Sequence, residues 1–251
     1  MKISGTRRHY ITLASVLFML VVWKLVSMHF RSDFILPPPE RALMTTLDLF
    51  TDQNFLAIAG STVLRGITGF ILSMILGIGV GIIAGVNRDF DAFIRPLIVT
   101  LRSVPVISFI LVALIWLSPG SVPVFVAMLT MFPFICTNVT EGIKSVDRDL
   151  IEMSEFYRVE KAKIVREVYI PAIMPFIISG ASSAMGIGWR AIIIGEVLSQ
   201  PKYGIGTVMQ NAQTFLNVDA VIAWTIIAVL VSYLFERMIR WSEKKLVTWR
   251  G

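Results

Sequence analysis

Apolar runs long enough to cross a membrane alternate with short polar stretches along most of the chain. The runs cover residues 10–29, 60–86, 97–117, 121–139, 168–198 and 218–238. A helix needs about 20 residues to cross about 30 Å of hydrocarbon, and no alternation typical of membrane β-strands repeats along the chain. The pattern therefore predicts an all-α fold: a polytopic membrane protein with six transmembrane helices in a single domain over residues 1–251.

The polar stretches between the runs predict turns and surface helices. A Pro119-Gly120 turn separates the third run from the fourth, so a tight antiparallel helix pair is expected there. The prolines of residues 37–39 are expected to precede a helix at the membrane interface, and Gly204 with Gly206 are expected to open another. Both surface helices fall in loops on the side of the membrane opposite to the two termini.

A charged island over residues 145–175 interrupts the apolar pattern and must face water. Asp147 or Ser145 is expected to cap a helix over about residues 148–158, with acidic residues early and basic residues late, as the helix dipole favours. Phe156 and Tyr157 supply aromatic surface between the charges. An apolar anchor with a charged rim is typical of a docking helix; a solvated helix lying on the membrane surface is the alternative.

Composition agrees with membrane insertion and argues against nucleic-acid binding. The chain is 55% hydrophobic and 16% charged with a mean hydropathy of +0.75, whereas soluble domains are about 25% charged. The net charge of +6 gathers at the ends of the apolar runs, which is a topology signal and predicts contact with lipid and no nucleic-acid partner. Most Lys and Arg residues share a side with both termini and the charged island, so that side is predicted to be cytoplasmic.

Several kinds of chemistry are excluded by what the chain lacks. Cys136 is the single cysteine, so no internal disulfide forms, and with only two histidines no metal site is expected. No Gly-x4-Gly-Lys-Ser/Thr phosphate loop is present. We therefore expect no catalytic residue, no ATP hydrolysis by the chain itself and no cofactor bound to it.

Small residues inside the apolar runs predict close helix packing. Gly77, Gly81 and Gly85 recur every four residues on one face of the second run, and small residues let membrane helices approach closely. The same spacing would also suit faces that slide during transport, and the sequence leaves both interpretations open.

Polar residues inside the apolar runs are candidates for function. Arg190 either faces a solute pathway and attracts an anion or pairs with another helix. Glu196 lies near the outer end of its run, where a structural bond to the loop of Gly204 and Gly206 is expected. Further candidates for lining a pathway are Ser103, Asn138, Ser182 and Ser183.

The order of residues in the charged island resembles a known signature. Glu152-Met153-Ser154 is followed by three residues, Arg158, nine residues and then Val168-Tyr169-Ile170-Pro171. This is similar to the cytoplasmic motif of binding-protein-dependent ABC importer permeases: Glu-Ala-Ala, three residues, Gly, nine residues, Ile-x-Leu-Pro. Met153 and Ser154 stand where that motif has alanines, and Arg158 stands where it has the glycine that permits a sharp turn between helices.

Fragments elsewhere in the chain strengthen the resemblance. Among such permeases, the chain is most similar to the nitrate/sulfonate/taurine type. The fragments keep the family's order from about residue 36 onward. These fragments are residues 36–39, 61–70, 95–96, 101–105 and 203–206, together with Trp189 and Glu196.

The resemblance implies a type I ABC importer fold with cytoplasmic coupling helices within residues 140–167. It implies that two copies form the pathway, that ATP-binding cassette subunits supply bound ATP and Mg, and that an extracytoplasmic protein delivers a small anion such as nitrate, a sulfonate or taurine. The location implied is the bacterial inner membrane. The coupling residues implied are Glu152, Met153, Ser154, Phe156, Tyr157, Arg158 and Pro171.

Two alternatives remain open at this point. The same machinery serves vitamin precursors or flavins in related permeases. An ion-coupled secondary transporter is the alternative from another class; such a protein needs a carboxylate or histidine deep in the bilayer, and only the peripheral Glu196 approaches that here.

Overall fold

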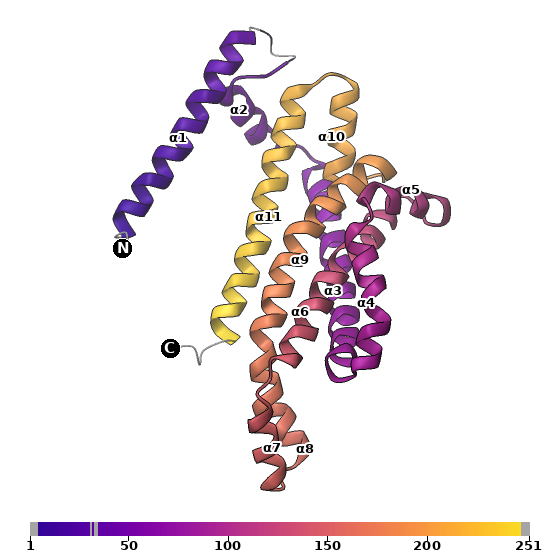
Figure 1. Cartoon of the computed structure of the whole chain (residues 1–251). Helices are drawn as coiled ribbons and strands as arrows, with labels where there is room; N and C mark the ends of the chain where they lie inside the picture. Colours follow the sequence, from indigo (N-terminus) through magenta and orange to yellow (C-terminus); the bar gives the residue numbers. More distant parts are fainter. Residues whose placement is uncertain (1–4, 31, 33–34, 247–251) are drawn as a thin grey trace.

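The computed structural model describes residues 5–30, 32 and 35–246, and these residues form helices joined by short connections (Figure 1). The predicted all-α fold is confirmed. In chain order the elements are α1 (Gly5–Phe30), α2 (Pro39–Leu49), α3 (Phe55–Val86), α4 (Arg88–Ser103), α5 (Val106–Trp116), α6 (Val122–Lys144), α7 (Arg148–Phe156), α8 (Lys161–Ile164), the π-helical segment η1 (Val165–Tyr169), α9 (Ile170–Ser199), α10 (Ile205–Thr214) and α11 (Val218–Leu246).

Within the described residues, five helical stretches are long and apolar enough to cross a membrane. They are α1, α3, α6, the continuous stretch from α8 to α9, and α11. The bent pair of α4 and α5 makes a sixth span if both helices count as one. The surface helices expected after residues 37–39 and at Gly204 also form, as α2 and α10.

The third predicted span is broken, so the prediction of one helix over residues 97–117 is wrong. α4 ends at Ser103, α5 begins at Val106, and their axes bend by 98°. Pro105 causes the break, because its ring lacks an N–H and forces the preceding residue out of the helical region. Val104 is accordingly extended, with φ −69° and ψ 130°.

Helix α6 is the centre of the bundle, with α3 on one side and α9 on the other (Figure 1). Ile135 and Val139 of α6 are fully buried. A Cβ at Gly77 would lie 2.7 Å from a methyl carbon of Ile135, and one at Gly81 would lie 2.9 Å from the carbonyl oxygen of Cys136. The glycine stripe of α3 therefore sets how closely α3 and α6 pack.

The two ends of the bundle differ. At one end the hairpin of α7 and α8 extends beyond the other helices (Figure 1). At the opposite end α10 packs against α11 and α9, and Arg41 of α2 pairs with Asp219 of α11 at 2.9 Å. These are called the hairpin end and the α10 end below.

A matched pair of substitutions on α3 tests the packing role of the glycine stripe. A methyl group added at Gly79 would have nothing within 4 Å, whereas one at Gly81 would press against the α6 backbone. Gly79→Ala should be neutral or stabilising because alanine favours helix by about 1 kcal/mol. Gly81→Ala should destabilise by about 1–3 kcal/mol through overpacking, measured as the thermal unfolding midpoint in detergent. Equal midpoints for the two variants would contradict the packing role.

Candidate functional site

The hairpin begins with a capped helix. The side chain of Asp147 accepts a hydrogen bond from the Asp149 N–H at 2.9 Å, which satisfies one of the free amides at the start of α7. This confirms one of the two predicted caps. The helix ends at Phe156, two residues before the predicted boundary of 158.

Helix α7 ends in a turn built around Arg158. The N–H of Val159 donates to the carbonyl oxygen of Ser154, and the N–H of Arg158 donates to that of Glu155, both at 2.9 Å. These are the two bonds of a Schellman motif, whose penultimate position takes a left-handed residue and is usually glycine. Arg158 has φ 51°, so it adopts the conformation that the family's glycine supplies, at a cost of about 1–2 kcal/mol.

The far side of α7 presents apolar side chains to solvent. Phe156 is 82% exposed, Tyr157 72% and Met153 52%. The rings of Phe156 and Tyr157 meet edge to face with centroids 5.6 Å apart. An exposed aromatic pair at the end of a charged hairpin is the kind of surface that a protein partner covers.

Ser154 is buried against the body of the protein, unlike that aromatic pair, whereas Glu152 is exposed at the base of the hairpin. Ser154 is buried, and its hydroxyl donates to the Leu150 carbonyl at 2.7 Å. Glu152 lines a cavity of about 550 Å³ at the base of the hairpin, together with Arg88 and Arg148. Glu152 therefore lies near the α3–α4 turn while remaining exposed to solvent.

The joint between the hairpin and the membrane helices is continuous. α8, η1 and α9 run without a break from Lys161 to Ser199. In η1 the N–H of Ile170 donates to the carbonyl of Val165, which is the wider i to i−5 pattern. The regular helix α9 begins directly afterwards at Ile170, and Pro171 is its second residue, where its missing N–H is accommodated by this wider turn.

One face of α9 carries polar and small side chains that its own chain leaves exposed. Ser179, Ser183, Gly186 and Arg190 follow helical spacing and are all exposed. Arg190 lies nine residues before the end of α9, or about 14 Å along the axis. A charge at that depth faces protein or water and not lipid.

Arg190 lines a cavity of about 680 Å³ between α9 and α11, together with Tyr233 and Glu236 of α11. The other pathway candidates do not line it. Ser103 donates to the Val99 carbonyl at 2.9 Å and Asn138 to the Phe134 carbonyl at 2.8 Å, so both bond their own helices. Ser182 is half-buried, and of the four candidates only Ser183 shares the exposed face of Arg190.

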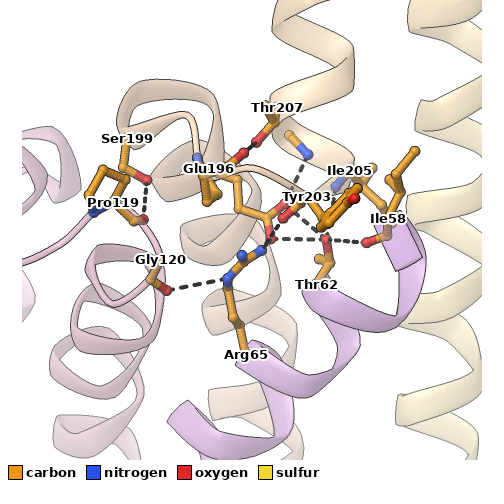
Figure 2. Close-up of polar contacts among 12 residues, drawn as sticks. Ile58, Thr62, Arg65, Pro119, Gly120, Glu196, Ser199, Tyr203, Ile205 and Thr207 are labelled. Carbon is orange, nitrogen blue, oxygen red and sulfur yellow. Dashed lines mark hydrogen bonds and ion pairs between the residues drawn. The ribbon is translucent and has the colours of Figure 1, made fainter. Parts of the chain in front are cut away.

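A buried polar cluster, called the Glu196 clasp here, joins α3 and α9 at the α10 end (Figure 2). The carboxylate of Glu196 is fully buried and pairs with the guanidinium of Arg65 at 2.6 Å. Thr62 donates to the same carboxylate at 2.9 Å, and so does the N–H of Gly206. The expected bond from Glu196 to the loop of Gly204 and Gly206 is thus present.

The clasp also holds two loops. Arg65 donates to the carbonyl of Tyr203 at 2.7 Å and to that of Gly120, in the α5–α6 turn, at 3.3 Å. A Cβ at Gly204 would lie 2.7 Å from the carboxyl carbon of Glu196, so a larger residue would displace the carboxylate. The sequence pattern did not single out Arg65 as the partner of Glu196; its spacing of three from Thr62, on one face of α3, is the available signal.

Removing the clasp carboxylate should loosen the α10 end. Glu196→Ala leaves the largely buried Arg65 guanidinium without its partner, which should cost up to about 3–5 kcal/mol. It should also loosen the backbone around Lys202, whose side chain is already exposed, and so speed cleavage there by trypsin. The thermal midpoint and the rate of cleavage at Lys202 measure this. Glu155→Ala, at an exposed site on α7, should change stability by less than about 0.5 kcal/mol. A stable, uncleaved Glu196→Ala protein would contradict the role of the clasp.

Known proteins resemble this chain over most of its length. Residues 77–248 match the family described as binding-protein-dependent transport system inner membrane component. A putative ABC transporter permease of Methanocaldococcus jannaschii is 29% identical, covering 92% of this chain and 88% of that protein. The taurine transport system permease of Escherichia coli is 24% identical (98% and 92% covered), and the bicarbonate transport system permease of Synechococcus elongatus is 29% identical (92% and 87%).

A solved structure shares the fold. A chain from the inward-facing MetNI methionine ABC transporter aligns with a TM-score of 0.62 at 16% identity, covering 77% of this chain and 94% of that one. The predicted type I importer fold is thereby confirmed. This chain belongs to the binding-protein-dependent transport system inner membrane component family, and it is a permease subunit of an ABC importer.

Proposed function

We propose that two copies of this permease form the pathway for a small anion and that α7 docks on a separate ATP-binding subunit. The observation that carries the proposal is the exposed pair of Phe156 and Tyr157 at the far end of a hairpin that extends beyond the bundle (Figure 1). Because α8 continues into α9 without a break, a push on the hairpin is passed to the membrane helix that carries Arg190. This is the rigid-element movement that switching between two conformations requires.

The proposal assigns the remaining components to partner subunits. ATP and Mg bind the motor subunits, because this chain has no phosphate loop. The hairpin end and both termini lie in the cytoplasm, as the distribution of Lys and Arg favours. A soluble binding protein then meets the α10 end, on the outer face of the inner membrane.

The coupling residues divide into two groups on this proposal. Met153, Phe156 and Tyr157 contact the motor subunit directly, because they are exposed on α7. Ser154 instead packs α7 against the permease body, and Glu152 lies exposed in the cavity that Arg88 and Arg148 also line. Pro171 marks the point where the hairpin helix becomes the membrane helix.

The relatives support an oxyanion as the solute. Their names specify taurine, aliphatic sulfonates and bicarbonate, and each of these carries a negatively charged oxyanion group at neutral pH. The planar guanidinium of Arg190 suits bidentate bonding to such a group. We place Arg190 and Ser183 along the pathway, while Ser103, Asn138 and Ser182 stay weaker candidates because of their bonds or burial.

The clasp argues against an ion-coupled secondary transporter. Such a carrier needs an intramembrane carboxylate that is free to bind its coupling ion. Glu196 is occupied by Arg65, Thr62 and the Gly206 amide. It is therefore suited to a structural role.

Reconstitution tests the whole proposal. The permease is placed in liposomes with its cognate ATP-binding subunit and binding protein, and uptake of labelled taurine, nitrate and bicarbonate is measured against that of riboflavin and a thiamine precursor. ATP-dependent uptake of one anion is expected. Uptake of only a vitamin precursor would contradict the assigned solute, and uptake without the ATP-binding subunit would contradict the motor coupling.

A substitution at the aromatic pair should weaken motor binding selectively. Phe156→Ala should lower the affinity for the ATP-binding subunit by about 30-fold or more, because truncating an interface hot spot costs about 2 kcal/mol or more. Phe215→Ala is the matched control: Phe215 is 83% exposed, against 82% for Phe156, but lies at the α10 end. Affinity is measured by titration in nanodiscs, and equal effects of the two substitutions would contradict docking at α7.

Neutralising Arg190 should slow transport without affecting assembly. Arg190→Gln should reduce anion uptake by at least about 10-fold, since a charge-assisted hydrogen bond is worth about 1.5–3 kcal/mol. Arg190→Lys, which keeps the charge, should retain more uptake than Arg190→Gln. Binding of the ATP-binding subunit should be unchanged in both variants. Normal uptake by Arg190→Gln would show that Arg190 does not line the pathway.

A further inference from the structure

Arg158 holds a left-handed backbone conformation that its side chain does nothing to favour. Among the described non-glycine residues, only Arg158, Gln200 and Leu216 have positive φ, at 51°, 46° and 56°. Glycine adopts this region without a steric penalty, whereas Cβ of any other residue crowds its neighbours. Strained residues persist where the surrounding structure enforces them, and they gather at functional sites.

The turn itself does not need the arginine. Both hydrogen bonds of the turn are made by backbone groups, from Arg158 to Glu155 and from Val159 to Ser154. A glycine at position 158 would make the same bonds without strain. The motif that this segment resembles has glycine there, so the geometry of the turn does not account for the arginine at position 158.

The side chain of Arg158 is directed to solvent at the edge of the apolar surface. Arg158 is exposed and directly follows Phe156 and Tyr157, which are 82% and 72% exposed. The ion pairs of the described residues do not include Arg158, although Glu155 and Glu160 are close in sequence. Its guanidinium is thus available to an external carboxylate.

We propose that Arg158 is a specificity-determining residue of the coupling surface, and that it pairs with a carboxylate on the ATP-binding subunit beside the pocket that takes Phe156. This inference rests on the proposed docking of α7. Arginine is one of the residue types enriched in interface hot spots, together with aromatic anchors. Its fixed, planar donors match a carboxylate in two parallel bonds, which lysine cannot reproduce.

Its position favours a protein partner over a lipid headgroup. The stretch from Lys161 to Pro171 is continuously helical, and its ten-residue rise amounts to about 15 Å. The corner that contains Arg158 lies at the far end of that stretch, beyond the ends of the other helices (Figure 1). An anionic headgroup is therefore the outcome to be tested and not the partner proposed.

The experiment compares two substitutions that relieve the same strain at opposite ends of the molecule. Arg158→Gly and Leu216→Gly each place glycine at a left-handed position, but Leu216 lies in the α10–α11 turn. Affinity for the cognate ATP-binding subunit is titrated in phosphatidylcholine nanodiscs at low and high salt. Arg158→Gly should weaken binding by about 10-fold or more at low salt, with a smaller difference at high salt. Leu216→Gly should bind like the wild type at both.

Further variants distinguish the effect of the side-chain charge at position 158 from the effect of its backbone conformation. Arg158→Asn keeps a residue that tolerates the left-handed region and should bind like Arg158→Gly, whereas Arg158→Lys should fall between Arg158→Gly and the wild type. Arg158→Glu should bind more weakly than Arg158→Gly and should be rescued by reversing one acidic residue of the ATP-binding subunit to arginine. Rescue of Arg158→Glu, with no rescue of Phe156→Ala by the same reversal, would locate the partner carboxylate.

The outcomes are distinct. Equal affinities of wild type and Arg158→Gly at both salt concentrations would overturn this inference alone. An effect of Arg158→Gly that appears only when phosphatidylglycerol is added to the nanodiscs would assign Arg158 to lipid and overturn it as well. If the wild-type permease itself does not bind the ATP-binding subunit, the proposed docking of α7 fails, and this inference fails with it.

Discussion

A charge buried among membrane helices must be paired, and the Glu196–Arg65 pair satisfies that constraint while holding the α10 end together. With one carboxylate and one guanidinium, the clasp connects α3, α9, the α5–α6 turn and the loop that leads into α10. The α5–α6 turn and the loop before α10 approach through backbone groups: the carbonyls of Gly120 and Tyr203 and the N–H of Gly206. The α10 end is therefore a unit whose parts move together, since separating any of them would leave a buried polar group unpaired.

The hairpin end differs from the α10 end in which groups lack partners inside the chain. At the hairpin end the polar groups are solvated, and the apolar Phe156 and Tyr157 are the groups left without a partner inside the chain. The unbroken helix from Lys161 to Ser199 joins this surface to the clasp, because Glu196 lies on its last turn. One continuous helix thus extends from the turn that follows the proposed motor contact, past Arg190, to the loops of the α10 end.

Arg158 shows how a departure from a family pattern can keep the fold and change the surface. The turn needs a left-handed residue with two backbone hydrogen bonds, and arginine meets that need with some strain. The backbone path is therefore the one that glycine would give. What changes is the charge and reach of the side chain at the rim of the docking surface, where partner choice is decided.

Features that depend on local chemistry could be predicted from the sequence by itself. The apolar runs located the membrane helices because partition into lipid depends on the composition of about 20 consecutive residues, and Asp147 and the motif position at Arg158 marked the cap and turn of α7. The 98° break at Pro105 was not predicted; Pro96 and Pro133 lie inside helices of the same chain, so a proline in an apolar run does not by itself mark a break. Only the folded structure brought Arg65 to Glu196, 131 residues away, and placed Arg190 on an exposed face. Such contacts depend on how distant helices pack, and no local pattern encodes that distance.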